Sequence, residues 1–223
     1  MTGADQVVEL DTPLGPSRVY AAAPRGAARA VLLLGHGAGG GVDAPDLVAL
    51  TALTEQGIAV LRYEQPWRTA GKKIAPAPAR LDEGWAPAVA YATDTHPGLP
   101  LLVGGRSAGA RVAVRWAADH PVAGVVALSF PLHPPGKPEK SRAPELLGAH
   151  SPVLVLQGER DPFGTPAEVA DVVYRAGATD IRVVVVPDCA HELKPPVRAA
   201  STPAQIAAVL TSDVGEFVDR VAE

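Results

Sequence analysis

Six short runs of valine, leucine, isoleucine and alanine are the feature that most constrains how this sequence folds. The runs are continuous and do not alternate with polar residues, which is typical of parallel strands buried on both faces of a sheet. They cover residues 30–34, 58–62, 100–103, 124–129, 153–157 and 182–186. Helical stretches are expected at residues 45–56, 84–95, 108–120, 166–176 and 203–222. This alternation predicts an α/β fold of three layers, with helices on both faces of a mostly parallel sheet.

The rest of the chain adds a hairpin, two helix starts and two long loops. Residues 7–10 and 17–22 are expected to form an antiparallel hairpin at one sheet edge, with a turn at residues 13–15. Thr165 and Thr202 each precede a proline and stand three residues before Glu or Gln, which is the pattern of a capping box. The expected loops are residues 64–82 and 131–151, and both follow strands. Since no repeat or linker divides the 223 residues, we expect a single domain, 1–223.

The composition argues against several classes of protein. A net charge of −4 disfavours a nucleic-acid surface, which normally carries a basic patch. The lone Cys189 allows no intramolecular disulfide and no multi-cysteine zinc cluster. No apolar run is long enough to span a membrane, and the N-terminus has no signal-peptide pattern. We therefore expect a cytoplasmic protein that binds neither nucleic acid nor a membrane.

Residues 105–109, Gly-Arg-Ser-Ala-Gly, carry the strongest chemical signal. A G-x-S-x-G motif that directly follows a strand and leads into a helix is typical of a nucleophile elbow, which exposes the serine hydroxyl. Glycine at 105 and 109 avoids clashes in so tight a turn. The motif predicts Ser107 as a nucleophile, and an ordinary serine in a glycine-rich turn is the alternative.

A serine nucleophile needs a base, which in turn needs an acid to orient it. His191 follows the last expected strand and should reach the same sheet edge as Ser107. His133 follows the strand at 124–129 and is the alternative base.

The acid is expected in the turn after the strand at 153–157. Asp161 lies four residues past that strand, where a turn can aim its carboxylate back toward the sheet edge. Glu159 is the alternative acid, while Asp188 is expected to cap its own loop. The sequence therefore predicts a triad of Ser107, His191 and Asp161.

The glycine-rich residues 35–41 suit an oxyanion hole. Acyl transfer needs two N–H donors directed at the oxygen that becomes negative. We expect the backbone N–H groups of Ala108 and Ala38 to be these donors, and His36 to brace the loop. The segment lacks the Lys-Ser/Thr of a P-loop and the spacing of a dinucleotide fingerprint, so we expect no phosphate-containing cofactor.

Together these motifs resemble the α/β-hydrolase superfamily. The shared segments are residues 36–40, 105–109, 158–164 and 190–191, with the triad in the order Ser107, Asp161, His191. Residues 61–68 and 130–138 resemble markers of small, lid-poor hydrolases near the dienelactone hydrolases and the testis-expressed-thirty and NSL-complex-subunit-three proteins. The resemblance spans residues 30 to 191. The chain differs from dienelactone hydrolases, which have a cysteine where Ser107 stands, and Ala108 replaces the Met or Gly of many relatives.

The motifs and the resemblance predict a serine hydrolase that cleaves a carboxylic ester, thioester or related acyl bond of a small molecule. No metal or organic cofactor is expected, because the activated serine supplies the nucleophile. The connection at 130–151 is too short for a large lid, although a second copy of the chain could cover the site. Acyl transfer or perhydrolysis on the same triad is one alternative. A catalytically silent module that binds a protein partner through the loop 131–151 is the other.

Several further residues could contact a substrate. The candidates are His36, Gly37, Trp67 and His133. The basic residues Arg68, Lys72, Lys73 and Arg80 could bind an anionic substrate group or form a solvated surface. Trp67 and Trp85 flank this basic loop and could line a pocket or pack in the core. Cys189 is expected to be a packed thiol.

Overall fold

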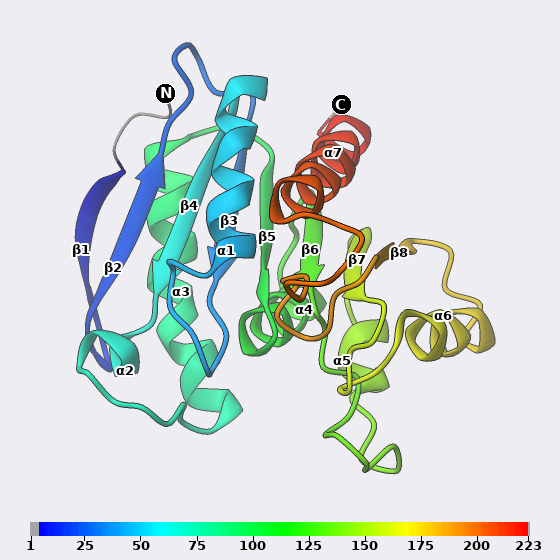
Figure 1. Ribbon diagram of the computed structural model, residues 1–223. Helices are drawn as coiled ribbons and strands as arrows, with labels where there is room; N and C mark the ends of the chain where they lie inside the picture. The colour runs from blue at the N-terminus through cyan, green and yellow to red at the C-terminus, as the bar shows by residue number, and fades with distance from the viewer. Residues whose placement is uncertain (1–4, 223) are drawn as a thin grey trace.

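The computed structural model describes residues 5–222, which form one eight-stranded sheet in the order β1-β2-β4-β3-β5-β6-β7-β8 (Figure 1). The strands are β1 (Gln6–Thr12), β2 (Gly15–Ala22), β3 (Ala30–Gly35), β4 (Ile58–Glu64), β5 (Leu101–Arg106), β6 (Gly124–Leu128), β7 (Val153–Gly158) and β8 (Ile181–Val186). Strands β3 to β8 are parallel, while β1 and β2 form an antiparallel hairpin beside β4. Both the parallel sheet and the edge hairpin are therefore confirmed.

Helices cover both faces of this sheet (Figure 1). They are α1 (Pro45–Ala49), α2 (Pro66–Thr69), α3 (Pro78–Thr95), α4 (Ala108–Asp119), α5 (Ala143–Leu147), α6 (Pro166–Arg175) and α7 (Pro203–Val221), with a 3-10 helix η1 (Leu50–Gln56) after α1. Alternate residues of each central strand point to opposite faces, so Leu33 packs with α3 and α4, whereas Leu32 packs with α1 and α7. Two apolar cores result, and the three-layer α/β prediction is confirmed.

Two helix starts behave as the sequence predicts. The Thr165 hydroxyl accepts a hydrogen bond from the Glu168 backbone N–H at 3.3 Å, and the Glu168 carboxylate accepts one from the Thr165 N–H at 2.7 Å. Thr202 and Gln205 make the same reciprocal pair at 3.2 and 2.8 Å. These capping boxes fix the first turns of α6 and α7.

Other helix predictions need correction. The helix expected at 45–56 divides into α1 and η1, where the hydroxyls of Thr51 and Thr54 each donate to a carbonyl three residues earlier and compete with the α-helical ladder. The helix expected at 84–95 begins six residues earlier, at Pro78, because proline suits the first helical position. The same preference places α2 and α5 inside segments predicted to be loops.

The last strand also differs from its prediction. The apolar run at 182–186 predicts a strand buried on both faces. In the structure β8 pairs with β7 alone among the described strands and lies at the edge of the sheet. Arg182 and Val185 are consequently exposed.

Among residues 5–222, no helix is both long and apolar enough to cross a membrane.

Candidate active site

The turn between β5 and α4 has the geometry of a nucleophile elbow. Ser107 adopts φ 53° and ψ −108°, a conformation that residues other than glycine rarely take and that costs backbone energy. A Cβ atom at Gly105 would lie 2.4 Å from the Gly35 carbonyl oxygen, and one at Gly109 would lie 2.3 Å from the same atom. Both positions therefore require glycine, because β3 passes directly against the elbow.

Ser107, His191 and Asp161 come together at the carboxyl ends of β5, β8 and β7. The distance from His191 Nε2 to Ser107 Oγ is 2.9 Å, and that from His191 Nδ1 to Asp161 Oδ2 is 2.8 Å. Because a carboxylate only accepts hydrogen bonds, Nδ1 carries the proton and Nε2 is left as an acceptor for the serine hydroxyl. This arrangement can remove a proton from Ser107.

The Asp161 carboxylate is held by groups that sequence reasoning missed. Its Oδ1 accepts a hydrogen bond from the Phe163 backbone N–H at 2.8 Å, and its Oδ2 accepts one from Gln157 Nε2 at 2.9 Å. The Phe163 ring also stacks on His191, with ring centroids 4.2 Å apart. Gln157 could have been selected from the sequence, because it is the polar residue of the otherwise apolar strand at 153–157 and a buried amide needs hydrogen-bond partners.

The alternative acids do not contact His191. The Glu159 carboxylate accepts a hydrogen bond from the Asp188 backbone N–H at 2.9 Å, and Asp188 accepts one from the Ser201 N–H at 2.9 Å. Hydrogen bonding from the Ser201 side chain and backbone holds the pKa of Asp188 below its ordinary value. Asp188 thus stabilises its own loop, as the sequence predicts.

The His133 ring contacts groups outside the triad. Its Nδ1 lies 3.0 Å from the Pro134 carbonyl oxygen, and its Nε2 lies 3.5 Å from the Glu168 carboxylate at the start of α6. The hydrogen bond to the Ser107 hydroxyl is made by His191 and not by His133, the alternative base. Its backbone N–H donates to the Phe163 carbonyl at 2.9 Å, which joins the loop after β6 to the loop that carries Asp161.

The loop after β3 packs against Ser107. A Cβ atom at Gly37 would lie 3.5 Å from the Ser107 Cβ, an ordinary van der Waals distance, so the loop lies close against the elbow. Ala38 is exposed at the turn that follows. Ala108 is the first residue of α4, where backbone N–H groups have no partner within the helix. Ala108 is therefore adjacent to the nucleophile in the chain, and Ala38 follows the glycine that lies close to it.

His36 braces this loop and is not placed as a base. Its Nδ1–H donates to the Gly37 carbonyl at 2.8 Å, and its Nε2 accepts from the Gln65 backbone N–H at 3.2 Å. Burial lowers the pKa of His36, which keeps the ring neutral. Its ring lies 5.5 Å from the Trp67 ring. The ring links the glycine-rich loop to the end of β4.

Trp67 and Trp85 are both buried, at 7% and 0% exposure. With His36, Gly37 and Ala108 they line a cavity of about 10 Å³, which is close to the space that one water molecule needs. Both indoles therefore belong mainly to the core.

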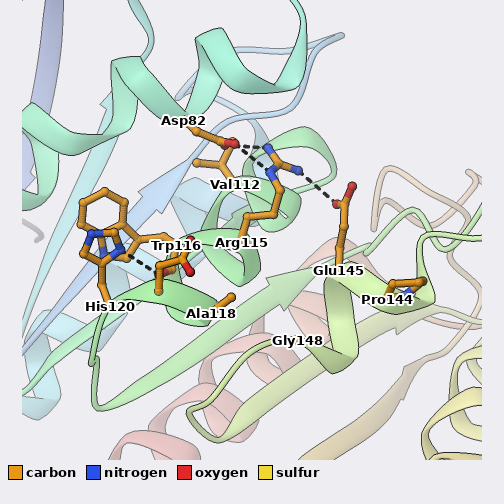
Figure 2. Close-up of a pocket in the computed structure, with 10 residues that line it drawn as sticks. Asp82, Val112, Arg115, Trp116, Ala118, His120, Pro144, Glu145 and Gly148 are labelled. Atoms are coloured by element: carbon orange, nitrogen blue, oxygen red, sulfur yellow. Dashed lines mark hydrogen bonds and ion pairs between the residues drawn. The ribbon is translucent and has the colours of Figure 1, made fainter.

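A second cavity, of about 490 Å³, lies over α4 between α3 and α5 (Figure 2). Figure 2 shows Arg115 between Asp82, at 2.7 and 2.9 Å, and Glu145, at 3.0 Å. The residues that line it do not include the triad. The cavity is larger than the one beside Gly37, yet Ser107, His191 and Asp161 do not line it.

Cys189 is buried beside the His191 loop, and burial raises the pKa of its thiol to about 11. At pH 8 we expect native protein to react with Ellman's reagent at least about 100-fold more slowly than an exposed thiol, because the thiolate is the reactive form. Protein unfolded in guanidinium should release one equivalent of the coloured product at the ordinary rate. Rapid reaction of one thiol in the native protein would contradict this placement.

Comparisons with known proteins agree with this fold. Residues 28–219 match the model of a family described as alpha/beta hydrolase domain. No curated protein sequence matches. Among solved structures, an alpha-beta serine hydrolase homologue from Coxiella burnetii is 17% identical with a TM-score of 0.77, over 96% of this chain and 99% of that chain. A serine hydrolase without a lid from Xanthomonas campestris is 21% identical with a TM-score of 0.73, over 97% and 96%. Dienelactone hydrolase from Anabaena variabilis is 20% identical with a TM-score of 0.74, over 100% of both chains.

Proposed function

Because this chain belongs to the alpha/beta hydrolase domain family, we propose that it is a serine hydrolase that cleaves a carboxylic ester, thioester or related acyl bond. The observation that carries the proposal is the continuous hydrogen-bonded path from Ser107 Oγ through His191 to Asp161, at 2.9 and 2.8 Å. A serine hydroxyl is a weak nucleophile at neutral pH, and such a path activates it.

In the proposed reaction the Ser107 oxygen attacks the acyl carbon while His191 Nε2 takes the hydroxyl proton. Asp161 stabilises the imidazolium and keeps the ring oriented. His191 then gives the proton to the leaving oxygen or sulfur as the bond to the acyl carbon breaks. Water, deprotonated by His191, attacks the acyl-serine, and His191 returns that proton to Ser107 Oγ as the acid leaves, which restores the free serine.

The negative oxygen formed in each step needs two N–H donors. Ala108 and Ala38 are the proposed pair, since one begins α4 and the other follows the glycine that packs on Ser107. Removing one such donor from an enzyme typically costs about 3–4 kcal/mol of barrier stabilisation. The glycine-rich loop thus has a catalytic reason to lie against the elbow.

The substrate is proposed to be small. The segment between β6 and β7 contains only the five-residue helix α5, which is too short to form a helical lid over the site. An open site gives a long acyl chain little surface against which to pack.

A panel of p-nitrophenyl esters from acetyl to lauroyl, together with acyl thioesters, tests the proposal that the substrate is small. We expect turnover of short acyl groups, with an acyl-enzyme mass in protein quenched during turnover. Absence of both turnover and acyl-enzyme across the panel would favour the silent binding module.

We also propose that the basic loop favours esters that carry an anionic group. Lys72 and Arg80 line a cavity of about 100 Å³ beside Gln65 and Trp67. Among the residues that the structure describes, the Arg80 side chain pairs with Glu83 alone, at 3.4 Å. Because this pair is exposed to water, it competes only weakly with a substrate anion for the guanidinium. Replacing both Lys72 and Arg80 by methionine should raise KM for a carboxylate-bearing ester several-fold to about tenfold, since each exposed charge contact contributes roughly 0.2–1 kcal/mol.

The matched control is Lys73→Met, which removes a neighbouring exposed charge that does not line the cavity. It should leave KM for the anionic ester within about twofold of the wild-type value. Equal changes in KM for anionic and neutral esters of the same acyl length in the Lys72/Arg80 variant would contradict the proposal.

A further inference from the structure

Arg106, the residue between Gly105 and Ser107, carries a buried positive charge directly behind the nucleophile. Its side chain is 10% exposed. The guanidinium touches three segments that are far apart in the sequence: the loop after β3, helix α1 and the loop that carries His191. We propose that Arg106 is a positioning residue, which holds the backbone of His191 and the glycine-rich loop at fixed distances from Ser107. This inference rests on the proposed hydrolase function.

The contact with His191 is made through its backbone. Arg106 Nη2 donates a hydrogen bond to the His191 carbonyl oxygen at 3.3 Å. The His191 ring is held separately, by Asp161 and by stacking on Phe163. The contacts with Asp161 and Phe163 fix the orientation of the imidazole. The hydrogen bond from Arg106 fixes the position of the His191 backbone relative to β5. Ser107 follows Arg106 in the chain, so this hydrogen bond ties the base to the residue next to the nucleophile.

The glycine-rich loop lies beside the Arg106 guanidinium. Cβ atoms at Gly37 and Gly40 would lie 3.4 and 3.7 Å from Arg106 Nη1. The loop therefore rests on a flat, rigid group. A Cβ atom at Gly37 would be within van der Waals distance of both Arg106 and Ser107, and the proposed donor Ala38 follows Gly37 directly. A shift of the guanidinium would move this donor relative to the acyl oxygen.

Asp46 supplies the counter-charge. Its side chain is fully buried in α1, and Arg106 Nε lies 2.8 Å from Asp46 Oδ2. Its other oxygen, Oδ1, accepts a hydrogen bond from the Leu47 backbone N–H at 3.0 Å. Burial raises the pKa of Asp46, and the charge of Arg106 opposes that shift. Removing one member of a buried pair leaves the other charge unpaired, which is strongly destabilising.

A buried ion pair is often no more stabilising than apolar residues of similar volume, so stability alone does not explain it. The planar fork of arginine can reach several partners in fixed directions, which lysine cannot do. The hydrogen bond to the His191 carbonyl and the proximity of the loop beside Ser107 point to placement as the reason for an arginine here. Misplacing a catalytic group by about 1 Å can cost about 100-fold in rate.

The test compares Arg106→Lys, Arg106→Met, the double variant Arg106→Met/Asp46→Leu, and the control Arg115→Met. The double variant removes both buried charges together, so it can fold where Arg106→Met alone fails. Arg115 on α4 also pairs with two carboxylates, those of Asp82 and Glu145, and neither residue belongs to the triad (Figure 2). Steady-state hydrolysis of p-nitrophenyl acetate, the rate of inactivation by a fluorophosphonate and the thermal midpoint are measured for each.

We expect the double variant to unfold near the wild-type temperature while its kcat falls about 10- to 100-fold and its KM stays within about threefold. Fluorophosphonate inactivation should slow by a similar factor, Arg106→Lys should be intermediate, and Arg115→Met should keep the wild-type kcat. A kcat of the double variant within about twofold of wild type would overturn the inference, as would a rise in KM alone. Wild-type protein that neither turns over the ester nor takes up the probe would instead overturn the proposed function.

Discussion

Replacing Ser107 by alanine is expected to lower kcat for ester hydrolysis by about 10⁴- to 10⁶-fold. The alanine keeps the Cβ atom and removes only the hydroxyl, whose hydrogen bond is to His191 Nε2 at 2.9 Å. Without the hydroxyl no acyl-enzyme forms, and the oxyanion donors alone can provide only a small residual rate. Ester hydrolysis measured on purified variant, with circular dichroism to verify folding, gives the result.

Ser129→Ala is the matched control. Ser129 also has a positive φ, 47°, and follows the neighbouring strand β6. Its buried hydroxyl has no hydrogen-bond partner among the described residues. The control should keep the wild-type kcat within about twofold. A Ser107→Ala variant that retains more than about 1% of wild-type activity would show that another group is the nucleophile.

Replacing Gly109 by alanine is expected to have the largest effect on stability. The added Cβ would lie 2.3 Å from the Gly35 carbonyl oxygen and 2.5 Å from its carbon, so β3 and α4 must separate by about 1 Å. Because protein interiors are closely packed, such overpacking against the backbone should cost about 3–5 kcal/mol of unfolding free energy. The same shift would move the glycine-rich loop away from Ser107 and remove most of the activity.

Urea unfolding followed by circular dichroism measures this loss. Gly26→Ala provides the control, since a Cβ atom at Gly26 meets no atom within 4 Å. Its unfolding free energy should stay within about 0.5 kcal/mol of the wild-type value. An equally small change for Gly109→Ala would show that the elbow does not need the close approach of β3.

Local sequence patterns predicted most of the architecture. The continuous apolar runs gave the six parallel strands, because burial on both faces leaves a strand no polar positions. The capping boxes at Thr165 and Thr202 marked two helix starts, since a cap depends only on residues within one turn. The helices α2, α3 and α5 were predicted less well, because the prolines in their first turns were interpreted as part of loops.

The candidate site was predictable only in part. The order of strands places residues that follow them at one edge, which is why Ser107, Asp161 and His191 could be selected together. The contact from Gln157 to Asp161, four residues later, depends on how the turn after β7 folds back, and the contact from Arg106 to the His191 carbonyl depends on packing between segments 85 residues apart. Neither residue belongs to a spacing pattern that would reveal its partner.

Intact-mass analysis after reaction with a fluorophosphonate tests the central claim most directly. We predict a single adduct on the wild-type protein, located on the peptide that contains Ser107. The adduct should be absent from Ser107→Ala and should form far more slowly on His191→Ala, where the base is missing. Folded wild-type protein that takes up no probe, or that takes it up at another serine, would contradict the account.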